Sequence, residues 1–157
     1  MKELRTEGLF FIANSKKRYN ICTVFTQLKM TKLNFVHLCD NAFLSAEGKL
    51  NLIGIFKNIS VVKFPASHPT MTVVVNITVD KEIALKIRLQ KKKAKEPIST
   101  IETKLTPPEK DNIEIGFIAN FNNIKFEESG EYEVEILIDN KPLEENVVPF
   151  TVQKVQK

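Results

Sequence analysis

Glycine, proline and cysteine are scarce in this sequence, and it contains no long hydrophobic run. The 157 residues include five glycines, seven prolines and two cysteines. Collagen-like and linker-dominated chains need far more glycine and proline, and a disulfide scaffold needs more cysteine. No apolar run approaches the ~20 residues that a membrane-spanning helix requires. We therefore expect a globular domain with no membrane association.

The composition that remains is that of a folded domain with an uneven charge distribution. Hydrophobic residues make up 43% of the chain and charged residues 27%, which allows a buried core. Residues 1–29 contain six basic and two acidic side chains, whereas residues 30–157 contain 17 of each sign. A nucleic-acid-binding domain would be basic in its own right. The charge balance therefore argues against nucleic acid as the main partner.

Residues 1–29 differ from the rest in pattern as well as in charge. Leu9–Ala13 is apolar but only five residues long, and Lys16-Lys17-Arg18 follows it closely. A secretory signal needs ~7–15 apolar residues and a small-residue cleavage site. We predict no such signal, a cytoplasmic location and unpaired cysteines. Residues 1–29 are expected to be an appendage, or to precede a natural start at Met30, and residues 30–157 to form a single domain.

Strand patterns dominate the chain from residue 33 onward. Ile83–Leu89 alternates apolar and polar residues, and so does Glu131–Ile138, which Asp139–Pro142 follows as a turn. No amphipathic helix separates the strands, so a parallel sheet is disfavoured. Seven or eight such strands predict an all-β fold, an antiparallel β-sandwich that is immunoglobulin-like in size.

The sequence also predicts where each strand begins and ends and which residues form the core. The predicted strands are Leu33–Cys39 continued by Asn41–Ser45, Leu50–Phe64 with a bulge or bend at Gly54 and Asn58, Met71–Val79, Ile83–Leu89, Ile98–Leu105, Ile113–Phe121, Glu131–Ile138 and Val147–Val152. The predicted core contains Leu52, Ile55, Val73, Val75, Leu85, Ile87, Phe117, Tyr132, Val134 and Ile136.

Four short phrases are distinctive as a set. They are Leu-Cys-Asp at 38–40, Gly-Lys-Leu-Asn-Leu-Ile-Gly-Ile-Phe at 48–56, Phe-Pro-Ala-Ser-His-Pro at 64–69 and Ser-Gly-Glu-Tyr at 129–132. Together they resemble a family of small uncharacterised bacterial proteins, a domain of unknown function, over residues 30–152. The resemblance implies a β-sandwich and a bacterial cytoplasmic origin, and it implies no activity.

Groups that could carry chemistry are few. The glycines match neither the dinucleotide nor the P-loop spacing. His37 and Cys39 share one face of a strand, and His68 would supply a third metal ligand or enzyme residue. A triad of Cys39, His68 and Asp40 fails because adjacent strand residues point to opposite faces. We therefore expect no cofactor and no enzyme activity, with a small enzyme or metal site at His37, Cys39 and His68 as an alternative.

Two segments are candidates for binding. Pro65 and Pro69 lack backbone donors, so Phe64–Pro69 is predicted to be a rigid loop at a sandwich end, where partners dock. An ordinary crossover between strands is the alternative for that segment. Its predicted contact residues are Phe64, Pro65, Ser67, His68 and Pro69.

The second candidate is an anion or nucleic-acid patch, for which the four basic residues are Lys91, Lys92, Lys93 and Lys95. No aromatic residue is interleaved with them as single-strand stacking requires, and lysines at a hairpin tip also protect a sheet edge. We predict a non-catalytic binding or interaction module, with a protein partner favoured over nucleic acid and the oligomeric state left open.

Overall fold

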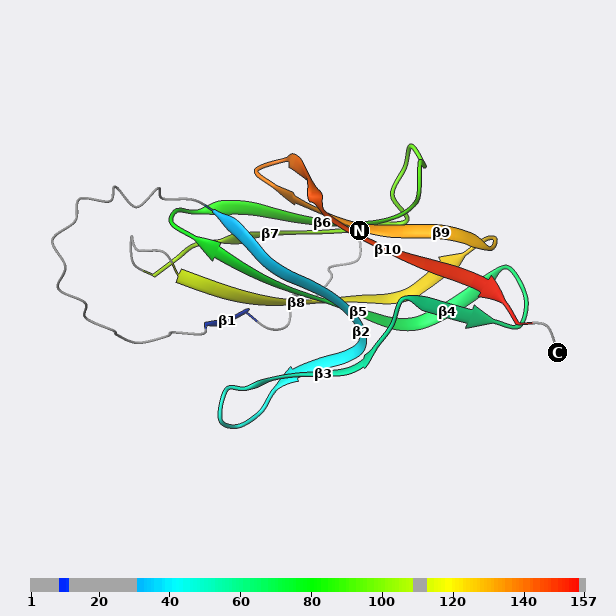
Figure 1. The fold of residues 1–157 in the computed structure, drawn as a ribbon, viewed down its shortest axis with the longest axis horizontal. Helices are drawn as coiled ribbons and strands as arrows, with labels where there is room; N and C mark the ends of the chain where they lie inside the picture. Colours follow the sequence, from blue (N-terminus) through cyan, green and yellow to red (C-terminus); the bar gives the residue numbers. More distant parts are fainter. Residues whose placement is uncertain (1–8, 12–30, 109–112, 156–157) are drawn as a thin grey trace, which may run out of the picture.

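Two five-stranded sheets pack face to face in the computed structural model, which describes residues 9–11, 31–108 and 113–155 (Figure 1). Ten strands lie in these ranges: β1 (Leu9–Phe11), β2 (Lys32–Leu44), β3 (Leu50–Ile55), β4 (Asn58–Val61), β5 (Ala66–Val79), β6 (Ile83–Lys91), β7 (Ser99–Leu105), β8 (Ile113–Phe126), β9 (Gly130–Ile138) and β10 (Lys141–Lys154). The predicted all-β sandwich is confirmed. Among the described residues no helix is long and apolar enough to cross a membrane.

The two sheets differ in strand direction. Sheet A has the order β1-β8-β5-β2-β3 and is antiparallel throughout. Sheet B has the order β4-β10-β9-β6-β7, and only its β4–β10 pair is parallel. The predicted strand Leu50–Phe64 divides into β3 and β4, because the chain crosses from sheet A to sheet B at Phe56 and Lys57.

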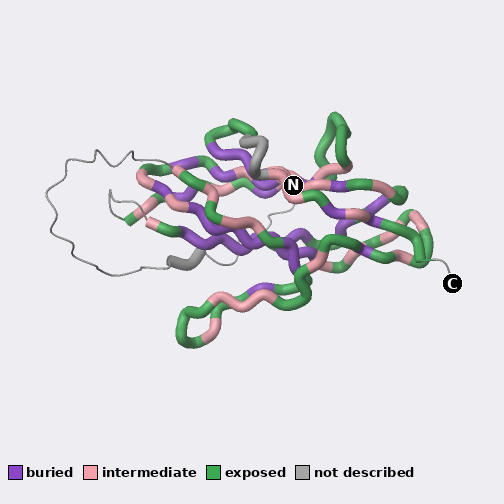
Figure 2. Tube along the Cα trace, in the orientation of Figure 1, coloured by how far each residue is buried: buried purple, intermediate pink, exposed green. Residues whose placement is uncertain are grey.

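The core lies between the sheets and follows the alternation of the strands. Alternate residues of β5, β6, β8 and β9 face the opposite sheet, and most of them are buried. Figure 2 shows these buried residues along the strands. Eight of the ten predicted core residues are buried, namely Val73, Val75, Leu85, Ile87, Phe117, Tyr132, Val134 and Ile136.

Two predicted core residues are placed differently. Ile55 is 60% exposed, and Leu52 is half-buried beside a small cluster outside the main core. Pairing of β2 with β5 ends at Cys39, whereas pairing of β2 with β3 continues to Leu44. The β2–β3 hairpin therefore extends beyond the sandwich, and no second layer formed by the described residues covers it (Figure 1).

The prediction that Phe64–Pro69 is a loop is wrong for most of the segment. Strand β5 begins at Ala66 and pairs with β8 from its first residue. Pro69 is tolerated because β2 pairs with β5 only from Thr72 onward, so one edge of the strand is free at Pro69. Only Phe64 and Pro65, which are joined by a cis peptide bond, remain outside the strands.

The packing of the core predicts a large loss of stability when a buried side chain is truncated. We expect Leu85→Ala and Ile136→Ala each to lower the free energy of unfolding by about 2–5 kcal/mol, because both side chains are buried between the sheets. Val155→Ala, at an exposed position, should change it by less than about 0.5 kcal/mol. Denaturant unfolding measures all three values. Losses below about 1 kcal/mol at both buried sites would show that the inward faces are misassigned.

Candidate functional site

Five rings gather where β5, β8, β9 and β10 meet the crossover between the sheets. Phe56 lies 6.2 Å from His68 and 6.5 Å from Phe150 between ring centroids, both edge-on. Tyr132 lies 5.8 Å from Phe150 and 4.9 Å from Phe126. Pairs at these distances add to the stability that burial provides. We call these five residues the aromatic cluster.

The aromatic cluster joins three of the four distinctive sequence phrases. Phe56 ends the phrase at 48–56, His68 belongs to that at 64–69, and Tyr132 closes that at 129–132. The Tyr132 hydroxyl also donates a 2.7 Å hydrogen bond to the carbonyl of Glu128. These residues thus hold one region of the sandwich together, which is a structural role.

His68 is the member of the aromatic cluster whose ring carries a buried nitrogen without a hydrogen bond. Within the described part of the chain, its Nε2 is buried and has no hydrogen-bond partner. A surface pocket of about 320 Å³ lies beside it, lined by residues 59–63 and 65–68. Three of the five predicted contact residues are strand residues: Ser67 and Pro69 are exposed and His68 is half-buried. Phe64 and Pro65 lie outside the strands, and Phe64 packs against the core.

His37, Cys39 and His68 do not converge. His37 is exposed and packs against Phe35 on the outer face of sheet A, with ring centroids 5.3 Å apart. His37 pairs with Val74, which lies six residues from His68 along β5, a separation of roughly 20 Å. No group of three or more His, Cys, Asp or Glu side chains that could hold a metal occurs among the described residues.

Cys39 sits in an environment that suppresses its reactivity. It is fully buried with Ala42, Val74 and Ile118, and its Sγ lies 3.8 Å from the carbonyl oxygen of Thr72. Burial raises the pKa of the thiol, and the charge of Asp40 raises it further. A nucleophilic cysteine needs the opposite shift. Cys39 is unpaired, and Cys22 lies outside the described residues.

The lysine patch is partly neutralised by the neighbouring turn. Because β6 pairs with β9 up to Lys91 and Tyr132, the turn between β8 and β9 lies beside the lysines. Lys91 forms a 2.5 Å ion pair with Glu128, and Lys92 a 2.6 Å ion pair with Glu131. These hydrogen bonds raise the pKa of both lysines. Within the described ranges, only Lys93 and Lys95 of the predicted patch have no ion pair.

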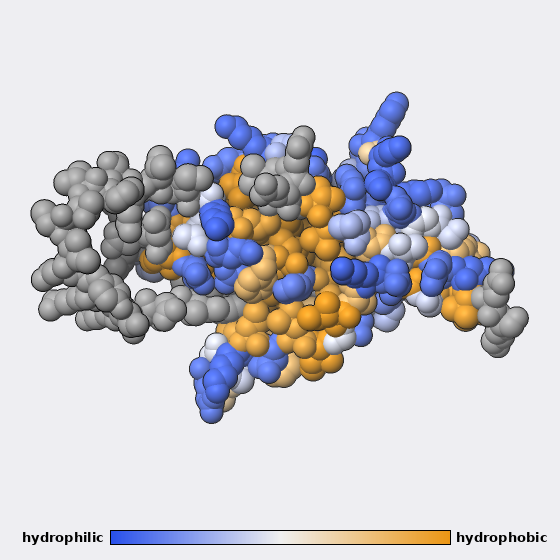
Figure 3. Space-filling model, in the orientation of Figure 1, coloured by the Kyte–Doolittle hydropathy of each residue, from blue (hydrophilic) through white to orange (hydrophobic). Residues whose placement is uncertain are grey.

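The most unusual surface is one that the sequence pattern did not single out. Exposed large hydrophobic residues gather on the β2–β3 hairpin, and the four there are Phe43, Leu44, Ile53 and Ile55. Figure 3 shows hydrophobic residues at the base of this hairpin and hydrophilic ones at its tip. Strand β3 itself carries no charged residue. The alternating pattern resembled a core strand, and nothing in the sequence indicated that the hairpin overhangs the sandwich.

Two glycines shape this hairpin. Gly48 has a φ of +75° in the turn, and its Ser45–Lys49 loop is closed by two backbone hydrogen bonds. Gly54 has a φ of +66°, and a Cβ there would overlap the Asp40 carboxylate. Asp40 belongs to the phrase at 38–40 and Gly54 to that at 48–56, so the close approach joins two of the four sequence phrases.

The structure of the hairpin predicts that alanine substitution lowers stability by different amounts at its two glycines. We expect Gly48→Ala to destabilise the protein by about 1–2 kcal/mol, because only its backbone conformation is unfavourable. Gly54→Ala should cost more, at least about 2 kcal/mol, since its Cβ also meets Asp40. Adding Asp40→Ala to Gly54→Ala should recover much of the difference. Thermal unfolding measures the stability of each variant. Equal losses of stability at both glycines would contradict the close approach of Gly54 to Asp40.

The buried thiol predicts a pH effect of known sign. As the pH rises above about 8.5, the unfolded chain loses the Cys39 proton while the folded chain keeps it. Stability should therefore fall on the alkaline side, and less so in Cys39→Ala.

In a Cys22→Ser background, a thiol reagent should modify native Cys39 on the order of 100-fold more slowly than the unfolded chain. Equal rates in the two states would mean that the thiol is accessible and ionised.

Comparison with known proteins identifies a family for this chain but no activity. No curated protein matches the sequence. Residues 34–153 match DUF6941, described as a family of unknown function. The match contains β3 to β9 whole and most of β2 and β10, together with all four sequence phrases, and it leaves β1 outside. The resemblance drawn from those phrases is thus confirmed, and the chain belongs to DUF6941, a family of unknown function.

Proposed function

We propose that the protein is a non-catalytic interaction module that binds other polypeptides through its β2–β3 hairpin. One observation carries this proposal. Of seven large hydrophobic residues exposed in the described structure, four lie on the β2–β3 hairpin: Phe43, Leu44, Ile53 and Ile55. Scattered exposed hydrophobic residues are ordinary, but a contiguous group marks a contact surface.

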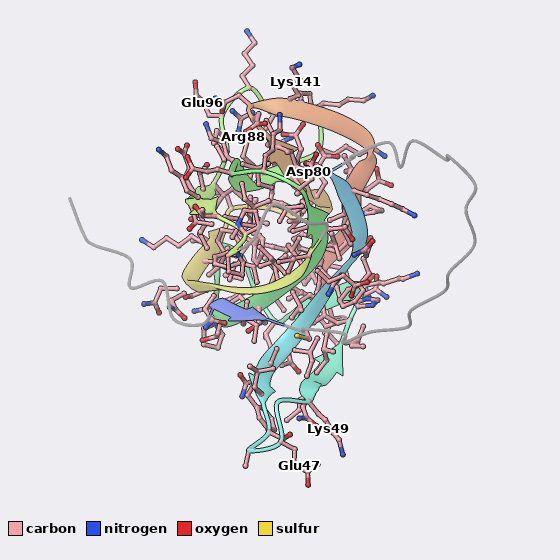
Figure 4. The ribbon with its side chains drawn as sticks, turned by 90° about the vertical axis from the view of Figure 1, so that its left-hand side faces the viewer. Glu47, Lys49, Asp80, Arg88, Glu96 and Lys141 are labelled. Atoms are coloured by element: carbon pink, nitrogen blue, oxygen red, sulfur yellow. The ribbon has the colours of Figure 1, made fainter. Side chains whose placement is uncertain are left out.

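The form of the surface favours a polypeptide ligand. The hairpin projects from the body, with Glu47 and Lys49 at its tip (Figure 4), whereas sites for small molecules are usually enclosed. Strand β3 also ends sheet A, and the main-chain groups of an edge strand can pair with another extended chain. These features support a protein partner over a small ligand.

The other candidate surfaces have less support. Lys91 and Lys92 are already paired with acids, which weakens the case for an anion or nucleic-acid partner. The Phe64–Pro69 segment borders the pocket beside His68, so it remains a second surface for a protein partner. The dispersion of His37, Cys39 and His68 supports a binding role over an enzymatic one.

Affinity capture from an extract of the native host tests the proposal. We expect polypeptides retained by the wild type to be lost at least about tenfold on Ile53→Lys, which places a charge on the exposed face of β3. Val155→Lys, which changes an exposed hydrophobic residue elsewhere, should retain them.

A second arm of the same experiment examines the other surface. If a folded Ser67→Ala/His68→Ala double variant loses the captured polypeptides while Ile53→Lys keeps them, the contact surface is the Phe64–Pro69 segment and the hairpin proposal is wrong.

A further inference from the structure

We propose that the pocket beside His68 binds a monocarboxylate whose charged group is attached to a small apolar body. This site is separate from the β2–β3 hairpin, so the inference goes beyond the proposed function and does not rest on it. It depends on the size of the pocket, on the chemistry of its lining and on the charges of the strands that border it.

The pocket lies where the chain passes from sheet B back to sheet A. Strand β4 and the first residues of β5 line it, together with residues 62, 63 and 65 of the connection between them. Figure 1 shows this connection at one end of the sandwich. The volume of about 320 Å³ is near the lower limit of small-molecule sites, which favours a small ligand.

The lining combines apolar side chains with hydrogen-bond donors and contains no acid. Five of its nine residues are aliphatic residues or proline. The other four offer donors, and they are Ser60, Lys63, Ser67 and His68. Donors with a positive charge among them complement the oxygens of an anion. The apolar share of the lining favours an anion with an attached hydrocarbon group over a bare inorganic ion.

The bordering strands add positive charge to the pocket. Strand β10 places Lys154 beside β4, and β8 places Lys125 opposite Ser67. Residues 57–69, which include the whole lining, contain two lysines and no acid. Within the described residues, none of Lys63, Lys125 and Lys154 forms an ion pair. These charges are therefore available to an anion.

Acidic side chains on the bordering strands are fewer. Glu127 and Glu128 follow the end of β8, which pairs with the start of β5. Glu128 already forms an ion pair with Lys91. Residues 151–154 of β10, which pair with β4, contain no acid. The three lysines therefore outnumber the available acid, and a positive local potential attracts an anion.

His68 supplies a wall of the pocket and has unused hydrogen-bonding capacity. Its ring packs edge-on against Phe56, with 6.2 Å between the ring centroids, and this contact holds the ring in place. Its Nε2 has no partner within the described part of the protein. A buried polar atom without a partner in a folded protein calls for an explanation, and a bound molecule is one. A carboxylate in the pocket would bring a polar group to the imidazole.

The lining favours a singly charged ligand. Phosphate recognition typically uses the planar fork of arginine, whereas the lining contains one lysine and no arginine. A lysine ammonium with nearby hydroxyl groups suits one carboxylate. Two sources share this chemistry, namely a free short-chain carboxylic acid and the C-terminal residue of a polypeptide.

An NMR titration of the purified full chain tests the site, because the sequence contains only two histidines. Isovalerate, added at fixed pH, should shift the imidazole signals of His68 to saturation, with the millimolar Kd of a very small ligand. His37 lies roughly 20 Å from His68 and should not shift, so it is an internal control. Isovaleramide, which has the same shape without the charge, should bind at least about tenfold more weakly.

One substitution in the lining tests the role of charge. Lys63→Gln should raise the Kd for isovalerate at least about fivefold, because it removes the lysine of the lining. Lys95→Gln, in the exposed β6–β7 loop, is the matched control and should leave the Kd unchanged. Ile53→Lys, on the hairpin, should also leave it unchanged. Failure of the hairpin proposal and failure of this inference are therefore distinguishable.

Two further ligands identify the source of the carboxylate. N-acetylglycylvaline ends in a free carboxylate, and its C-terminal amide has none. Tighter binding of N-acetylglycylvaline than of isovalerate, with no binding of the amide, would support the C-terminal residue of a polypeptide as the ligand. Tighter binding of isovalerate would support a free carboxylic acid.

Other results of the same titration would overturn the inference. They are equal shifts of both histidines, the absence of a saturable shift at His68, binding of isovaleramide as tight as that of isovalerate, and an unchanged Kd in Lys63→Gln. Tighter binding of inorganic phosphate than of isovalerate would also overturn it, because the ligand would then not be a carboxylate.

Discussion

The long ladder between β5 and β8 is the constraint on which the other parts of the molecule depend. It runs from Ala66 opposite Phe126 to Val79 opposite Ile113. Its inward side chains form one wall of the core, and its two edges accept β2 and β1. Near Pro69 and Asn123, which has a φ of +53°, both strands change which residues face inward. That change turns His68 and Ile124 toward the core and so makes the aromatic cluster possible.

Much of this architecture can be predicted from the sequence. A strand with one buried and one exposed face alternates apolar and polar residues. Ile83–Leu89 shows it clearly, and the structure buries the expected side of that strand. The same rule fails at Ile55, since alternation reveals that a strand has an apolar face and does not reveal whether another layer covers it. It also fails at Pro69, because a missing donor matters only when both strand edges are paired.

The candidate sites were harder to predict than the fold, since each depends on contacts between distant segments. The sequence alone predicts a free cationic patch that includes Lys91 and Lys92. In the structure, the pairing of β6 with β9 brings Glu128 and Glu131 beside these two lysines. The phrase at 64–69 read as a docking loop, although His68 contributes to internal packing. The sequence predicts a bulge or a bend at Gly54, but its contact with Asp40 depends on the register of the hairpin.

The crossover at Phe56 and Lys57 gives the protein a mechanical property. The Phe56 amide donates to the Leu38 carbonyl in sheet A, and one residue later the Lys57 carbonyl accepts from Thr151 in sheet B. A pulling force applied to the β2–β3 hairpin is therefore shared by both sheets within two residues of chain. Along β4 and β10, which are parallel, that load acts on several ladder bonds together in shear, so the hairpin is anchored against tension by the whole sandwich.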